Sequence, residues 1–190
     1  MRSDAVRAFV AVELGAGARA AAAALVRRLR ERPGAEGVRW VPEENLHVTL
    51  RFLGDVERER LPGLAAAVRA AAAPLPPFAL ALGPLHAFPS PRRPRVVALA
   101  LVPEAPLAAL AEAIEAALRA RGVAPEARRF RSHLTLGRSR GPALALDLAG
   151  AEAEPARFDV REAVLFQSEL SASGARHRAL ERLPLAGGGS

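Results

Sequence analysis

The chain has 190 residues, 51% of them hydrophobic, a formal net charge of +7 and no cysteine. This length suffices for one compact domain or two closely packed half-domains, and the lack of cysteine excludes disulfides, thiolate zinc sites and a cysteine nucleophile. All 27 basic residues are arginine, and their excess favours a polyanionic partner such as nucleic acid.

The N-terminal region is apolar, but charged side chains interrupt it at Asp4, Arg7, Glu13 and Arg19. Neither the apolar core of a signal peptide nor a membrane-spanning length accumulates between these charges. We therefore expect a cytoplasmic protein that does not enter a membrane.

The first half of the chain alternates between strands and helices. Residues 6–14 are predicted to form a strand, and an alanine-rich helix follows over residues 15–32. Two more strands are predicted over residues 37–41 and 46–54, separated by a Pro-Glu-Glu-Asn turn. A second helix is expected over residues 57–73. The short links between strands predict antiparallel pairs.

The second half follows a similar order. Strands are predicted over residues 77–88 and 95–102, joined by a proline-rich loop whose basic side chains, Arg92, Arg93 and Arg95, either attract RNA phosphates or are simply solvated. One apolar stripe predicts a helix over residues 106–122, with Gly122 as its C-terminal stop. Further predicted segments are strands at residues 128–140, 161–170 and 176–185 and a flexible tail at residues 186–190.

A tetrad of the form His-x-Thr-Leu occurs twice, beginning at His47 and again at His133, each time on a predicted strand. This repetition predicts an α+β fold of two pseudo-equivalent lobes, with mainly antiparallel sheets flanked by helices around a central cleft. We expect residues 1–185 to form a single bilobal domain in which each lobe contributes one tetrad. A site at the seam between the lobes would then collect one histidine from each.

The tetrads predict acid-base chemistry on a phosphodiester. Alternate side chains of a strand share a face, so His47 with Thr49, and His133 with Thr135, are expected to face one ligand. Of two imidazoles near neutral pH, one can be a base and the other an acid, while threonine hydroxyls bind phosphate oxygens. By the same alternation, Arg51 is predicted to continue the first polar face.

A metal-dependent site is the weaker interpretation of this pattern. Each tetrad offers one good ligand, the chain has no thiolate, and the nearby carboxylates are Glu43, Glu44 and Asp55. We therefore expect neither a metal nor another cofactor.

Three further side chains are assigned from the pattern of residues. His86, beside Phe88 and Pro89, is interpreted as a structural residue. Alternation places Phe52 opposite His47, which favours core packing over base stacking. It also places Arg138 off the face of His133, unless Gly137 bends the strand.

The segments RAFVAVEL, WVPEENLHVTLRFLGDV, FPSPRRPRVVALAL, HLTLGR and LFQSELSASGARHRALERLPL occur in one order along the chain. In this order and rough spacing they resemble the RNA 2′,3′-cyclic phosphodiesterases, once called 2′-5′ RNA ligases, of the two-histidine phosphoesterase superfamily. The resemblance covers nearly the whole chain. It implies a bilobal fold and metal-independent hydrolysis of a terminal 2′,3′-cyclic phosphate to a 2′-phosphate.

By motif position, the resemblance implies that His47 is the proton donor to the leaving 3′ oxygen and that His133 is the base that activates water. Thr49 and Thr135 would hold the phosphate, and Arg138 resembles a family position. Arg51, from the strand pattern, and Arg138 are expected as further substrate-binding residues. His177 lies where relatives often carry an aromatic residue, and we interpret it as a packing or rim residue. The expected partner is RNA with a cyclic end, such as a tRNA fragment, or a small cyclic nucleotide, bound by a monomer. Two alternatives stay open, namely 2′-5′ ligation and a non-catalytic module that binds RNA or nucleotides.

Overall fold

The computed structural model describes residues 4–88, 95–141, 146–171 and 174–187. The helices are α1 (Ala16–Arg30), α2 (Leu61–Ala72) and α3 (Glu104–Arg119), and short 3-10 turns η1 (Ala35–Gly37), η2 (Glu43–Asn45) and η3 (Arg58–Arg60) precede β2, β3 and α2. The strands are β1 (Ala5–Glu13), β2 (Val38–Trp40), β3 (His47–Glu57), β4 (Phe78–Phe88), β5 (Val96–Val102), β6 (His133–Ser139), β7 (Arg157–Val160), β8 (Glu162–Ser171) and β9 (Gly174–Pro184). Arg92 and Arg93 of the predicted basic loop lie outside the described residues.

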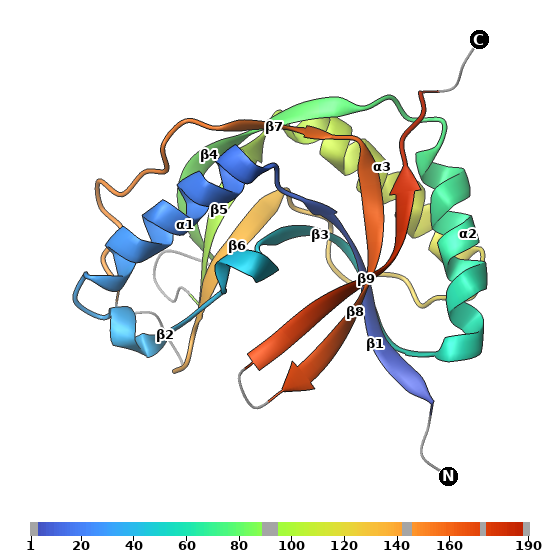
Figure 1. Cartoon of the computed structure of the whole chain (residues 1–190), viewed down its shortest axis with the longest axis horizontal. Helices are drawn as coiled ribbons and strands as arrows, with labels where there is room; N and C mark the ends of the chain where they lie inside the picture. Colours follow the sequence, from blue (N-terminus) through green and yellow to red (C-terminus); the bar gives the residue numbers. More distant parts are fainter. Residues whose placement is uncertain (1–3, 89–94, 142–145, 172–173, 188–190) are drawn as a thin grey trace.

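The strands form two antiparallel sheets, which confirms the predicted α+β class with two lobes (Figure 1). The first sheet has the order β3-β1-β8-β9 and carries His47, and the second has the order β2-β6-β5-β4-β7 and carries His133. The sequence did not predict β7. This strand has only four residues, but its buried Phe158 and Val160 alternate with exposed side chains, as expected for an edge strand over a core.

The helices cover the outer faces of the two sheets (Figure 1). Helices α2 and α3 pack against each other and against the first sheet, and α1 contacts β7 of the second. The predicted stripe of α3 is fully buried at Leu107, Leu110, Ile114 and Leu118, and each such side chain stabilises the fold by roughly 1.5–3 kcal/mol. Gly122 adopts a φ of 75° just after α3, as its predicted role of helix stop requires.

Both tetrad-bearing strands contain a β-bulge at the fourth residue of the tetrad. In β3, Thr49 pairs with Ala11 and Arg51 pairs with Val10, which leaves Leu50 as the extra residue. In β6, Thr135 pairs with Ala98 and Gly137 pairs with Val97, which leaves Leu136 as the extra residue. Because a bulge inserts one residue, every side chain after it changes face relative to simple alternation.

The C-terminal end departs from the expected tail. Ala186 donates a backbone hydrogen bond to the carbonyl of Ala73 at 3.1 Å, and Gly187 donates one to Leu75 at 3.0 Å. The chain therefore stays attached to the end of α2 through residue 187. Among the described residues, no helix combines the length and the hydrophobicity needed to cross a membrane.

Candidate active site

The strands that carry the two tetrads contact each other where the sheets meet. Strands β3 and β6 contact each other although they belong to different sheets, and His47 and His133 are the first residues of these strands. Their side chains, and those of Thr49 and Thr135, are half-buried, whereas the alternating residues Val48 and Leu134 are fully buried. The predicted face of each tetrad is therefore confirmed.

Both histidines are held by the same local hydrogen bond. The Nδ1 atom of His47 lies 2.7 Å from the carbonyl oxygen of Asn45, and the Nδ1 atom of His133 lies 2.8 Å from the carbonyl oxygen of Arg131. A carbonyl oxygen only accepts, so Nδ1 must carry the hydrogen in both rings. Each Nε2 is thus left to exchange a proton with a ligand.

The hydroxyl of Thr49 lies within reach of the first of these Nε2 atoms. Its Oγ1 atom is 3.1 Å from Nε2 of His47. When the imidazole is neutral, Nε2 accepts and the threonine hydroxyl donates; when it is protonated, the direction reverses. A threonine in this position can follow the charge state of the histidine.

The bulge at Leu136 brings Arg138 onto the face of His133. Strand pairing sets Arg138 opposite Arg39 of β2 and Gly137 opposite Trp40, so the two arginines share one face. A Cβ atom added to Gly137 would lie 2.6 Å from Cγ1 of Val38. The sequence placed Arg138 on the face of His133 only if the strand was irregular near Gly137. The bulge at Leu136, next to Gly137, is that irregularity.

The equivalent bulge at Leu50 reverses two predictions on β3. Arg51 was predicted to share the face of His47, but its side chain is 7% exposed and points the other way. There it donates hydrogen bonds to Glu115 of α3 and to the carbonyl oxygen of Ala124. The prediction that Arg51 continues the polar face is wrong, because the extra residue shifts the alternation.

Phe52 takes the place expected for Arg51. Its side chain is 49% exposed, and its ring lies 5.9 Å from the ring of Phe9 on the same face as His47. The prediction that Phe52 packs in the core is therefore wrong. An exposed aromatic ring beside a histidine offers a surface on which a nucleobase can stack.

Aromatic side chains surround both histidines. The ring of Phe9 lies 4.9 Å from His47 and stacks on Phe166 at 5.2 Å. On the second sheet, Phe88 lies 5.6 Å from His133. Sequence reasoning missed Phe9 and Phe166, because their alternating patterns on β1 and β8 are those of ordinary core residues.

His177 on β9 joins the group around His47. The two imidazole rings lie 5.0 Å apart, and the edge of His177 meets Phe9 at 5.0 Å. Its Nδ1 atom is buried and has no hydrogen-bond partner among the described residues. Asn45 maintains this arrangement, since its side-chain amide donates to the carbonyl of Ala175 at 2.7 Å. His86 is exposed and lies beside Phe88.

The environment of His47 favours its neutral form. Burial is the main cause that lowers the pKa of His47 to about 4; His177 and the positive charges of Arg138 and Arg19 act in the same direction, and the hydrogen bond to the carbonyl of Asn45 acts against them. Burial likewise lowers the pKa of His177. A site with this much positive potential attracts an anion, and a bound anion would return a proton to His47.

In the part of the chain that the structure describes, no group of three or more His, Asp or Glu side chains is placed to hold a metal ion. Glu43, one of the carboxylates considered for such a site, lies near Arg27 of α1 at 3.9 Å. Its backbone carbonyl accepts a hydrogen bond from Arg19 at 3.0 Å. This contact ties the turn before His47 to α1.

The model of the family "LigT like Phosphoesterase" matches residues 12–98 and 99–177. The chain belongs to this family. The first matched segment contains the tetrad at His47 and the second contains the tetrad at His133. The family match thus repeats along the chain in the same way as the tetrads.

Similar proteins and similar solved structures agree with this assignment. The RNA 2′,3′-cyclic phosphodiesterase of Archaeoglobus fulgidus is 35% identical over 133 residues, or 70% of this chain and 72% of that protein. The crystal structure of TT0787 of Thermus thermophilus has a TM-score of 0.78 and 30% identity, covering 95% of this chain and 98% of that one. E. coli LigT complexed with 3′-AMP has a TM-score of 0.76 and 26% identity, with coverage of 95% and 98%.

Proposed function

We propose that this LigT-like phosphoesterase hydrolyses the terminal 2′,3′-cyclic phosphate of RNA to a 2′-phosphate. The observation that carries the proposal is the matched pair of histidines, each with Nδ1 tied to a backbone carbonyl, which leaves Nε2 as the atom that exchanges a proton with the ligand. Two such groups on facing strands suit a reaction that moves one proton on each side of a phosphorus atom. Relatives named RNA 2′,3′-cyclic phosphodiesterase support the same substrate class.

The reaction divides into two proton transfers. His133 takes a proton at Nε2 from a water molecule, whose oxygen forms a bond to phosphorus. The bond between phosphorus and the 3′ oxygen breaks, and the 3′ oxygen takes a proton from Nε2 of His47. The products are a 2′-phosphate and a 3′-hydroxyl. Thr49, Thr135 and Arg138 bind the phosphate oxygens as negative charge develops there.

The role of His47 as the acid requires it to gain a proton when the substrate binds. Its pKa of about 4 in the free protein leaves it neutral near pH 7. The anionic cyclic phosphate adds a negative charge beside the ring and opposes the arginine charges that lower this pKa. Substrate binding and protonation of His47 are therefore coupled in this scheme.

The exposed ring of Phe52 adds a place for the terminal base. It lies on the face of His47, next to Phe9. Stacking on an aromatic ring accepts any base, so this contact would position the 3′-terminal nucleotide without selecting its sequence.

The experiment that tests this function uses the purified protein, EDTA and a short RNA that ends in a 2′,3′-cyclic phosphate. We expect a 2′-phosphate product, identified by comparison with authentic 2′-phosphate, 3′-phosphate and 2′,3′-cyclic phosphate ends. A 3′-phosphate product would overturn the assigned direction of bond cleavage. Intact substrate with folded protein would overturn the function.

A further inference from the structure

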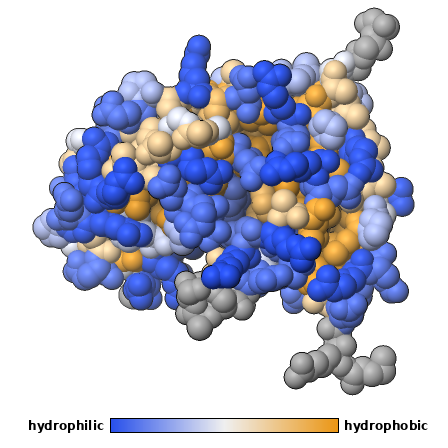
Figure 2. Space-filling view, in the orientation of Figure 1, coloured by the Kyte–Doolittle hydropathy of each residue, from blue (hydrophilic) through white to orange (hydrophobic). Residues whose placement is uncertain are grey.

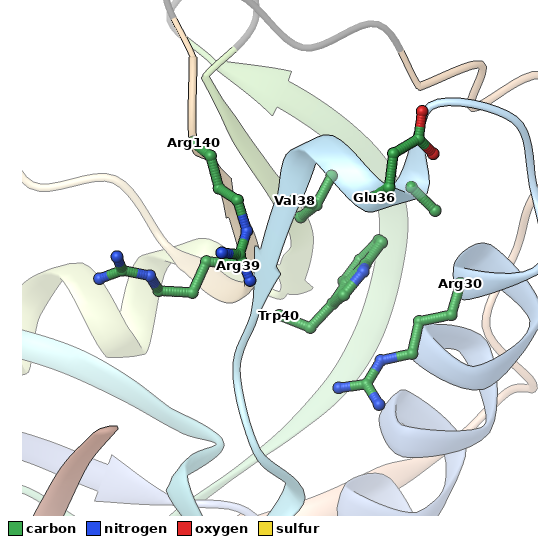
Figure 3. Close-up of a pocket in the computed structure, with 7 residues that line it drawn as sticks. Arg30, Glu36, Val38, Arg39, Trp40 and Arg140 are labelled. Carbon is green, nitrogen blue, oxygen red and sulfur yellow. The ribbon is translucent and has the colours of Figure 1, made fainter. Parts of the chain in front are cut away.

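A concave surface lies at the edge of the second sheet (Figure 3), and none of the histidines lines it. It has a volume of about 510 Å³, within the range of ligand-binding clefts, and we call it the Trp40 pocket. Its lining residues are Arg30, Ala35, Glu36, Val38, Arg39, Trp40 and Arg140. Figure 3 shows the indole of Trp40 facing Arg30 of α1, while the carboxylate of Glu36 points away from both.

The charges of this pocket are not neutralised within the protein. Arg30, Arg39 and Arg140 are exposed, and none of their guanidinium groups forms an ion pair or a hydrogen bond with another described residue. Arg51, Arg69 and Arg182, by contrast, are each paired with a carboxylate. Figure 2 shows that the side of the molecule around α1 and β2 is largely hydrophilic.

Strand pairing connects the Trp40 pocket to the active site. Arg39 of β2 lies opposite Arg138 of β6, and Arg138 is close enough to His47 to lower its pKa. The neighbouring residue, Trp40, presents its ring on the other side of the same edge strand. Arg39 lines the pocket and lies beside Arg138, so these two positive charges connect the pocket to the surroundings of His47.

The length of β6 exceeds the reach of a single nucleotide. His133 begins β6 and Ser139 ends it, and at about 3.3 Å per residue the strand spans roughly 20 Å. A ligand that contacts both ends must be several nucleotides long. Arginines along a backbone path and one aromatic ring are the elements with which proteins bind single-stranded nucleic acid.

We propose that the Trp40 pocket binds the RNA strand upstream of the cyclic end, with a base stacked on Trp40 and phosphates held by Arg30 and Arg140. This inference rests on the proposed function, because it extends the path of the same substrate. It makes single-stranded RNA, rather than a free cyclic nucleotide, the preferred substrate class. A mononucleotide occupies the histidines alone and gains nothing from the pocket.

Trp40 provides a direct readout, because it is the only tryptophan in the chain and there is no tyrosine. We expect a short single-stranded RNA with an ordinary 3′ end to quench the tryptophan emission as it binds, and 2′,3′-cyclic AMP to leave the emission unchanged. Emission that stays constant while the RNA is shown to be bound by fluorescence polarisation would overturn the proposal.

A double variant tests the arginines. The double variant Arg30→Gln, Arg140→Gln should bind RNA about tenfold more weakly. The slope of log K against the logarithm of the salt concentration should become shallower by about 0.7 for each phosphate that the variant no longer binds. Hydrolysis of 2′,3′-cyclic AMP should be unchanged. The matched control is Arg157→Gln, an exposed arginine of β7 at the opposite edge of the same sheet, which should leave RNA binding as it is.

The two measurements separate this inference from the proposed function. If cyclic AMP and cyclic-ended RNA are both left intact while the double variant still loses RNA binding, the proposed function fails and the pocket stands. If cyclic-ended RNA is hydrolysed and the double variant binds and hydrolyses it like the parent protein, the function stands and the pocket is overturned.

Discussion

The two histidines of the active site are oriented by their own backbone rather than by a buried carboxylate. Each Nδ1 atom meets the carbonyl oxygen of the residue two positions earlier, and this neutral acceptor fixes the tautomer without adding a negative charge. The imidazole of His47 therefore keeps a pKa that responds to the ligand instead of being held protonated.

Replacement of either histidine should remove the proton transfer it performs. We expect His47→Ala and His133→Ala each to lower kcat/KM on cyclic-ended RNA by about 10²- to 10⁴-fold, the usual contribution of a positioned acid or base. His86→Ala serves as the control, because His86 is an exposed histidine that contacts Phe88 and has no role in the proposed proton transfers. Full activity in a folded His47 or His133 variant would contradict the acid-base scheme.

The pKa of His47 gives a second prediction at the residue scale. In the free protein, burial and neighbouring positive charge hold it at about 4, so the ring takes up its proton only when the pH falls through that value. A bound nucleoside 2′-phosphate should raise this midpoint, because its negative charge favours the imidazolium form. The change is measured by following the His47 Cε1 proton in NMR titrations with and without the nucleotide. A midpoint that stays still or falls on binding would rule out His47 as the acid.

At the scale of elements, the two bulges decide which side chains reach the active site. Each bulge lies at the last residue of a tetrad, Leu50 or Leu136. The second residue after the bulge, Phe52 or Arg138, therefore faces the histidines. The residue directly after each bulge faces the other way, where Arg51 meets α3 and Gly137 meets β2. The first strand thereby supplies an aromatic surface and the second a positive charge.

Gly137 should be sensitive to the smallest possible enlargement. In Gly137→Ala, the added methyl group would lie 2.6 Å from Val38 and 2.9 Å from Trp40, so β2 or β6 must move. We expect a loss of about 1–3 kcal/mol in the free energy of unfolding, typical of overpacking, together with lower kcat/KM because Arg138 shifts with its strand. Denaturant unfolding and steady-state kinetics measure the two effects.

Gly63 of α2 is the matched control for this substitution. A Cβ atom there would meet nothing within 4 Å, so Gly63→Ala should stabilise the protein by up to about 1 kcal/mol through the lower entropy of the unfolded chain. If both alanine substitutions changed the free energy of unfolding equally, the close contact predicted at Gly137 would not destabilise the protein.

At the scale of the whole molecule, Arg51 links the two tetrad-bearing strands. It projects from β3, binds Glu115 on α3, and reaches the carbonyl of Ala124 and the carboxylate of Glu126 at 3.5 Å. Glu126 in turn donates its backbone N–H to Glu115 at 3.1 Å. Residues 124–126 lie in the segment that leads from α3 to His133. The buried side chain of Arg51 therefore attaches the segment before the second tetrad to β3, the strand of the first tetrad.

Removal of this arginine should destabilise the whole domain. We expect Arg51→Met to lower the free energy of unfolding by about 1–3 kcal/mol, since it removes the ion pair with Glu115 and the hydrogen bond to the carbonyl of Ala124 that the buried arginine makes. Arg182→Met breaks an ion pair with Glu13 at 2.7 Å at a half-exposed position and should cost less than about 1 kcal/mol. Chemical denaturation of both variants provides the comparison, and a loss no larger for Arg51 than for Arg182 would contradict its role as a link between the strands.

Much of this architecture follows from local pattern. Hydrophobic periodicity predicted the three helices and eight of the strands near their observed bounds, because each pattern reflects burial of one face. The repeated His-x-Thr pairs predicted the histidines and threonines of the site, since two residues of the same strand separated by one other share a face before any irregularity intervenes.

Only the tertiary structure decided the rest. Whether Arg51, Phe52 or Arg138 faces the histidines depends on bulges that form when β3 pairs with β1 and β6 pairs with β5, and such pairing joins segments far apart in the chain. The positions of Phe9, Asn45 and His177 depend on the same long-range contacts. The sequence by itself determined which side chains we propose to carry the chemistry, because local alternation is a property of one strand. The structure decided what surrounds them, because register is a property of strands in contact.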